Sequence, residues 1–134
     1  MQKPIEIKRA VNFLWIAIAV GFLKPLINWQ YFQQTIAQAS LGFILTVIVL
    51  TLAIQIFLIY KISIGRNWAR ILFLILTLIG MVIFVPTVLA EVDLSLLSAV
   101  ISVVQAGLQI TALWIMFTSP GKLWFKPPQQ PVAE

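Results

Sequence analysis

The sequence predicts an all-α membrane protein: a polytopic, antiparallel four-helix transmembrane bundle that forms one domain over residues 1–134. Of the 134 residues, 61% are hydrophobic and only 10% are charged, whereas soluble domains carry about 25% charged residues. The few charges leave long uncharged stretches, and a membrane-spanning helix needs about 20 mainly apolar residues. The basic residues gather at the termini and in the middle connection, which is the pattern of helices that cross a membrane back and forth.

The first span is predicted over residues 10–28, directly after the basic residues of the N-terminus. The uncharged residues 10–23 are too few to cross about 30 Å of hydrocarbon at 1.5 Å per residue, so the helix must continue past Lys24. Pro25 removes one backbone hydrogen bond and is expected to bend the helix there. The second span is predicted over residues 40–60, because the uncharged residues before it are rich in amide side chains.

The third and fourth spans are predicted over residues 69–90 and 95–117, since each fills one uncharged stretch of suitable length. Pro86 is expected to kink the third span near its end. Residues 29–39, between the first two spans, form either a short interfacial helix or a plain loop. The Pro-rich tail, residues 127–134, is predicted to be disordered.

The basic residues also predict the orientation. Eight of the nine lie on one side of the four predicted spans, namely Lys3, Lys8, Arg9, Lys61, Arg66, Arg70, Lys122 and Lys126. Positively charged loops are retained in the cytoplasm, so both termini are expected to be cytoplasmic.

A stripe of neutral polar side chains is the first candidate site. At 100° per residue, the serines and glutamines of the fourth span share one face, and polar side chains in lipid turn toward other helices. The predicted polar interior of the bundle consists of Gln55, Thr77, Ser98, Ser102, Gln105 and Gln109. Gln55, Thr77 and Gln109 lie at similar depth and are expected to share one layer, so that Gln109→Leu would destabilise the bundle. The stripe either joins helices by hydrogen bonds or lines a cavity for a polar solute.

Two groups of charged residues are further candidates. Lys24, Glu91 and Asp93 form a predicted outer cluster, in which Lys24 either pairs with one of the acids or extends to the membrane surface. Lys61, Arg66 and Arg70 form a predicted cytoplasmic surface that either docks a partner or contacts anionic lipid head groups.

The composition excludes many functions. The chain has no cysteine and no histidine, which excludes disulfides, Cys/His zinc sites, haem ligation by histidine and histidine-based triads. Ser98 and Ser102 have no histidine as a base, and Lys24 is expected to lie too far away on another helix. We therefore predict no enzymatic activity, no cofactor, no metal and no nucleic-acid partner.

Two functional hypotheses are left. The first is a structural or accessory subunit that docks a partner, with the lipid bilayer, anionic lipid head groups, another membrane protein or a second copy of the chain as partners. The alternative is a small oligomeric channel or transporter for a polar solute that uses the Ser/Gln stripe of the fourth span.

Three segments carry a family resemblance: residues 7–15 (IKRAVNFLW), 60–70 (YKISIGRNWAR) and 117–125 (FTSPGKLWF). With them, the whole chain resembles a group of small uncharacterised bacterial membrane proteins with four transmembrane helices. The resemblance implies a location in the bacterial inner (plasma) membrane and implies no activity.

Overall fold

The computed structural model describes residues 4–29, 33, 37, 40–118 and 121–125, and these form four long helices and one short 3₁₀ helix. The helices are α1 (Ile5–Ile27), α3 (Leu41–Ser63), α4 (Asn67–Leu94), α5 (Leu96–Phe117) and η1 (Gly121–Phe125). The predicted tail, residues 127–134, and most of the predicted segment 29–39 lie outside the described residues.

Each of the four long helices is long and apolar enough to cross a membrane. The chain is therefore an all-α integral membrane protein, and the predicted fold class is confirmed. The helix ends lie within five residues of the predicted spans. The largest difference is at the start of α1, which begins at Ile5 because the residues around Lys8 and Arg9 continue the helix beyond its apolar part.

The end of the bundle at which α1 and α4 begin and α3 and α5 end is here called the basic end. It carries Lys8, Arg9, Lys61, Arg66 and Lys122. The hydrophobic core lies near this end, where all four long helices and η1 contribute buried side chains, including Ile7, Leu58, Ile62, Phe73, Met116 and Phe125. The helices are consequently held together most firmly at the basic end.

The turn between α3 and α4 requires a glycine. Gly65 has φ = 81°, a value that side-chain-bearing residues rarely adopt. Its N–H donates to the carbonyl of Ile62, and the N–H of Arg66 donates to the carbonyl of Lys61. These two bonds form a Schellman motif, which ends α3 and sends the chain straight into α4.

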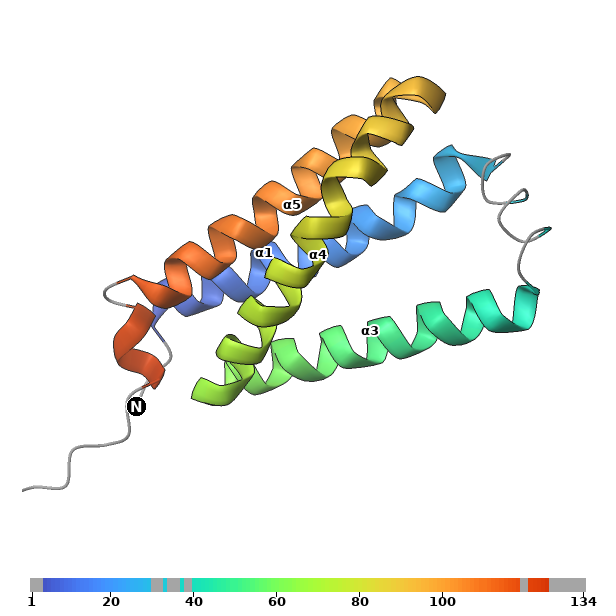
Figure 1. Ribbon diagram of the computed structural model, residues 1–134. Coiled ribbons are helices and arrows are strands. Elements are labelled where there is room, and N and C mark those ends of the chain that lie inside the picture. The colour runs from blue at the N-terminus through green and yellow to red at the C-terminus, as the bar shows by residue number, and fades with distance from the viewer. Residues whose placement is uncertain (1–3, 30–32, 34–36, 38–39, 119–120, 126–134) are drawn as a thin grey trace, which may run out of the picture.

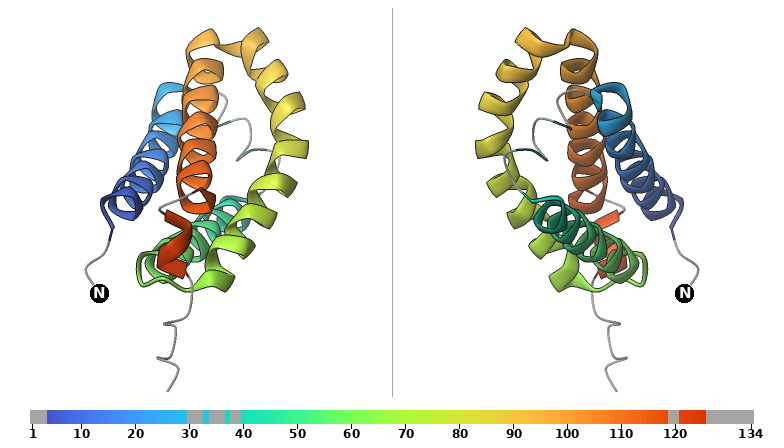
Figure 2. Two further views of the ribbon diagram at one scale, coloured as in Figure 1. Left: turned by 90° about the vertical axis from the view of Figure 1, so that its left-hand side faces the viewer. Right: turned by 90° about the vertical axis from the view of Figure 1, so that its right-hand side faces the viewer.

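Helices α1 and α5 lie side by side along most of their lengths, whereas α3 and α4 do not (Figures 1 and 2). The buried residues of α3 are all close to its C-terminal end, namely Leu58, Ile59 and Ile62. Helix α4 begins beside α3 and ends beside α5, so its middle crosses the space between them (Figure 1). It bows outward in Figure 2 and contains Pro86, which cannot donate a helical hydrogen bond. The bundle is therefore closed at the basic end and wider toward the other.

Candidate functional site

A cluster of close polar contacts joins α1, α4 and α5 far from the basic end. The Lys24 ammonium donates to Glu91 Oε1 at 2.5 Å and to Ser102 Oγ at 2.6 Å. The Ser102 hydroxyl in turn donates to Glu91 Oε2 at 2.5 Å. The side chains of Lys24 and Glu91 are only 27% and 13% exposed. Lys24, Glu91 and Ser102, called here the ion-pair triad, thus connect three helices by charge-assisted hydrogen bonds.

The ion-pair triad belongs to a longer series of contacts between α1 and α5. Asn28 Nδ2 donates to Ser98 Oγ at 2.5 Å. At Gly21, an added Cβ would stand 2.8 Å from Nε2 of Gln105, so the Gln105 amide packs directly on this glycine. Since α1 and α5 are antiparallel, each step of three or four residues along one matches the same step backward along the other. The small and polar face of α1 therefore fits the Ser/Gln stripe of α5.

Asp93 does not join this cluster. Asp93 is exposed and forms no ion pair within the part of the chain that the structure describes. Of the two acids predicted as possible partners of Lys24, the structure therefore has Glu91 paired and not Asp93, for a geometric reason. Two residues along a helix correspond to a rotation of about 200°, so Asp93 and Glu91 point to opposite sides of α4.

The expected separation between Lys24 and the serines of α5 was also wrong. Lys24 Nζ lies 2.6 Å from Ser102 Oγ, because α1 and α5 pair closely along this face. The arrangement differs from that of a serine activated by a lysine base, since an ammonium paired with a carboxylate has donors and no free acceptor. The contact therefore has the chemistry of a structural hydrogen bond.

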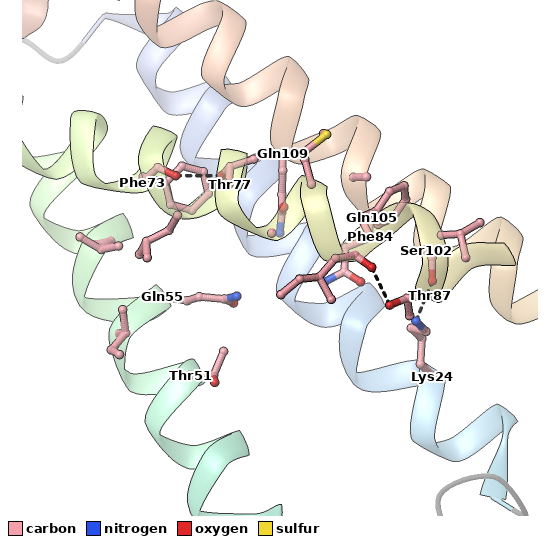
Figure 3. Close-up of a pocket in the computed structure, with 18 residues that line it drawn as sticks. Lys24, Thr51, Gln55, Phe73, Thr77, Phe84, Thr87, Ser102, Gln105 and Gln109 are labelled. Atoms are coloured by element: carbon pink, nitrogen blue, oxygen red, sulfur yellow. Dashed lines mark hydrogen bonds between the residues drawn. The ribbon is translucent and has the colours of Figure 1, made fainter. Parts of the chain in front are cut away.

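A cavity of about 550 Å³ lies between α3, α4 and α5 (Figure 3). Its polar lining residues are Lys24, Thr51, Gln55, Thr77, Thr87, Ser102, Gln105 and Gln109. The rest of its wall is mainly apolar, as in Ile54, Leu76 and Phe84. A mainly apolar wall with a few convergent polar groups is typical of small-molecule sites, which measure roughly 300–1,000 Å³.

Three amides that line this cavity have no hydrogen-bond partner among the residues that the structure describes. Gln55 of α3 and Gln109 of α5 point into the space between these two helices, and the Gln105 amide lies in the cavity wall against Gly21 of α1 (Figure 3). None of the three makes a side-chain hydrogen bond to another described residue. Thr77 differs, because its hydroxyl donates to the carbonyl of Phe73 in its own helix at 2.8 Å. The predicted interior residues thus divide into Ser98 and Ser102, which bond to α1, and the amides, which face the cavity.

The basic-end side of the cavity is closed. Leu58 and Phe73 line the cavity and are 1% and 6% exposed, and both also belong to the hydrophobic core. Ile54, Leu76 and Ile83 line it elsewhere and are 43%, 42% and 64% exposed. The cavity therefore opens between the helices toward the lipid, while packed side chains close it toward the basic end.

Because the Gln109 amide has no hydrogen-bond partner among the described residues, Gln109→Leu is no longer expected to destabilise the bundle. A polar group without a hydrogen bond in an apolar setting destabilises the fold, so this substitution should leave the melting temperature in detergent unchanged or raise it. Ser102→Ala serves as the comparison and should lower it, because Ser102 has partners on α1 and α4. A clear fall for Gln109→Leu, equal to that for Ser102→Ala, would show that Gln109 bonds to another helix.

Arg70 at the basic end is turned inward. Its guanidinium donates to the carbonyl of Met116 at 3.1 Å and lies over the rings of Phe117 and Phe125, 4.8 and 4.5 Å from their centroids. Such cation–π contacts connect the start of α4 to the end of α5 and to η1. Arg70 is thus engaged within the fold, unlike Arg66, which is exposed. Of the three residues predicted as a docking surface, Lys61 and Arg66 are the ones that suit it.

The sequence did not predict the bridging position of Ser102 or the inward position of Arg70. The position of Ser102 could have been predicted, since the spacing of Gly21, Lys24 and Asn28 matches that of the Ser/Gln stripe and so indicates that these two helix faces pack together. Arg70 carried no such signal, because its partners come from distant parts of the chain.

Comparisons with known protein families, with curated proteins and with solved structures found no match to this chain. Its fold and site alone define it as a small polytopic membrane protein with a lipid-facing cavity.

Proposed function

We propose that this chain is a non-enzymatic accessory protein of the bacterial inner membrane that docks another membrane component in its cavity. One observation carries the proposal: Gln55, Gln105 and Gln109 line a lipid-facing cavity and have no hydrogen-bond partner among the described residues. Polar groups inside a membrane are costly unless they are paired, so they mark functional positions. A docked component would supply the missing partners.

The orientation belongs to the same proposal. With the basic end in the cytoplasm, both termini are cytoplasmic, as the distribution of Lys and Arg favours. At the basic end, the Lys61 ammonium lies over the rings of Phe57 and Tyr60, 5.2 and 5.7 Å from their centroids. In the proposed orientation, Lys61 and Arg66 are at the cytoplasmic membrane surface, where they are suited to bind anionic lipid head groups.

The alternative is a channel or transporter for a polar solute, which the amide-lined cavity also favours. A route through one protomer would have to pass Leu58 and Phe73, which close the cavity at the core. Such a route would therefore need a different arrangement of α3 or an assembly of several copies. A docking cavity needs neither, so we place the accessory role first.

The test fills the cavity. Gly80 lines it, and a Cβ added there would have no neighbour within 4 Å, so Gly80→Phe should project a ring into open space. The matched control is Gly107→Phe, since Gly107 also has no neighbour within 4 Å and does not line the cavity. Each variant is affinity-purified from native membranes in mild detergent, and bound proteins and lipids are identified by mass spectrometry. We expect a component that purifies with the unmodified chain and with Gly107→Phe and is lost with Gly80→Phe. Identical sets of bound molecules for all three would contradict the proposal.

A further inference from the structure

The size, charge and depth of the cavity define the chemistry of its occupant. The observed 550 Å³ matches a pocket for one small molecule. The occupant is therefore a small molecule that reaches the cavity through the lipid.

The charges of the residues that line the cavity favour an uncharged ligand. Among the described residues that line the cavity, Lys24 is the one that carries a charge. Its ammonium is already paired with Glu91, so an anionic head group would find no unpaired cation. Burying a charge without a partner is costly. The free groups are amides instead, and each amide offers both donors and an acceptor to a hydroxyl or carbonyl.

The depth of the amides excludes a phospholipid head group. Gln55 stands six residues from Lys61, which is proposed to lie at the head groups, and Gln109 stands eight residues from Phe117 at the end of α5, which corresponds to about 9 and 12 Å at 1.5 Å per residue. Gln105 lies one turn further in. With a hydrocarbon core of about 30 Å, the amides sit well inside the apolar region. A phospholipid head stays at the membrane surface, whereas the hydroxyl or carbonyl of a simple lipid can enter.

We propose that the cavity binds an uncharged amphipathic lipid, whose hydroxyl or carbonyl head bonds to Gln55, Gln105 and Gln109. Its chain lies along the apolar wall formed by residues such as Leu76 and Ile83 of α4. This inference rests on the proposed docking role of the cavity and names the class of molecule that docks there.

The experiment compares two photoactivatable probes with the same chain, hexadecanol and hexadecyl sulfate, each with a diazirine in the chain. The full-length protein in nanodiscs is irradiated with each probe, and labelled peptides are identified by mass spectrometry. We expect the alcohol to label the cavity walls of α3, α4 and α5, with labelling by the charged sulfate roughly tenfold lower. An excess of hexadecanol without the diazirine should suppress the signal.

Two variants and one control variant show whether the label reports binding in the cavity. The triple substitution Gln55→Leu, Gln105→Leu and Gln109→Leu removes all three head-group partners and should reduce cavity labelling by the alcohol roughly a hundredfold, because about 1 kcal/mol is lost for each of the three hydrogen bonds. Gly80→Phe should abolish it, whereas Gly107→Phe should leave it intact. Equal labelling by both probes, or full labelling of the triple variant, would overturn the inference.

The outcome also separates this inference from the proposed function. If neither probe labels the cavity and Gly80→Phe still removes a co-purifying protein, the lipid inference is overturned and the docking role stands. If Gly80→Phe changes nothing that is bound and neither probe labels the cavity, both are overturned.

Discussion

Replacing Lys24 with glutamate is expected to lower the melting temperature in detergent by about 10 °C. Removing one partner of a largely buried ion pair costs about 3 kcal/mol or more, because the other charge is left without compensation. Lys24→Glu goes further, since it places a second carboxylate beside Glu91, whose side chain is only 13% exposed. It also removes the donor that Ser102 accepts from. The ion-pair triad joins three helices, so its loss should separate α1 from α4 and α5 at that end of the bundle.

The charge-swapped double variant shows whether the lost ion pair causes the lower melting temperature of Lys24→Glu. Glu91→Lys combined with Lys24→Glu restores opposite charges at the same two positions and should recover at least half of the lost melting temperature. Asp93→Asn is the matched control, because Asp93 is exposed on the same helix and forms no ion pair among the described residues. It should leave the melting temperature unchanged. A double variant as unstable as Lys24→Glu alone would mean that Lys24 acts by reaching the membrane surface and not by pairing.

The spans could be predicted from the sequence because their signals are local. A run of about 20 uncharged residues has few stable states in a membrane other than a helix, so the gaps between charges marked the third and fourth helices directly. The first helix was found by extending its short gap past Lys24, and the second by setting aside the amide-rich residues before it. The relation of Lys24 to Glu91 was also accessible, since so few charges lie on that side of the spans. Asp93 was grouped with them because the prediction used depth and ignored the rotation between residues of one helix.

The cavity could not be predicted, because it depends on how α3 diverges from α5. The sequence places Gln55, Thr77 and Gln109 at similar depths, and all three do line one cavity. Depth alone does not give the distance between helices, which is set by the core around Leu58 and by the crossing of α4. The sequence therefore favoured a layer of bonded amides, whereas the amides face open space. Arg70 illustrates the same limit, since its partners Met116, Phe117 and Phe125 are brought to it only by the fold.

The second large effect is expected at the contact between α1 and α5. Ala17 is 2% exposed and lies on the face of α1 that packs against α5. In membranes, small residues at such faces allow the backbones to approach closely, and packing replaces the hydrophobic effect as the source of stability. Ala17→Leu should force the helices apart and lower the free energy of unfolding by about 1–3 kcal/mol.

Ala19→Leu provides a matched control for this effect. Ala19 lies two residues further along the same helix at almost the same depth, but it is exposed, so a leucine there should contact lipid and leave the melting temperature nearly unchanged. The difference between the two variants isolates the packing of α1 on α5 from any general effect of a larger side chain. Because the ion-pair triad depends on the same close approach, Ala17→Leu should also abolish most of the additional destabilisation caused by Lys24→Glu. Fully additive losses in the double variant Ala17→Leu/Lys24→Glu would instead show that the small-residue contact and the ion pair stabilise the bundle independently.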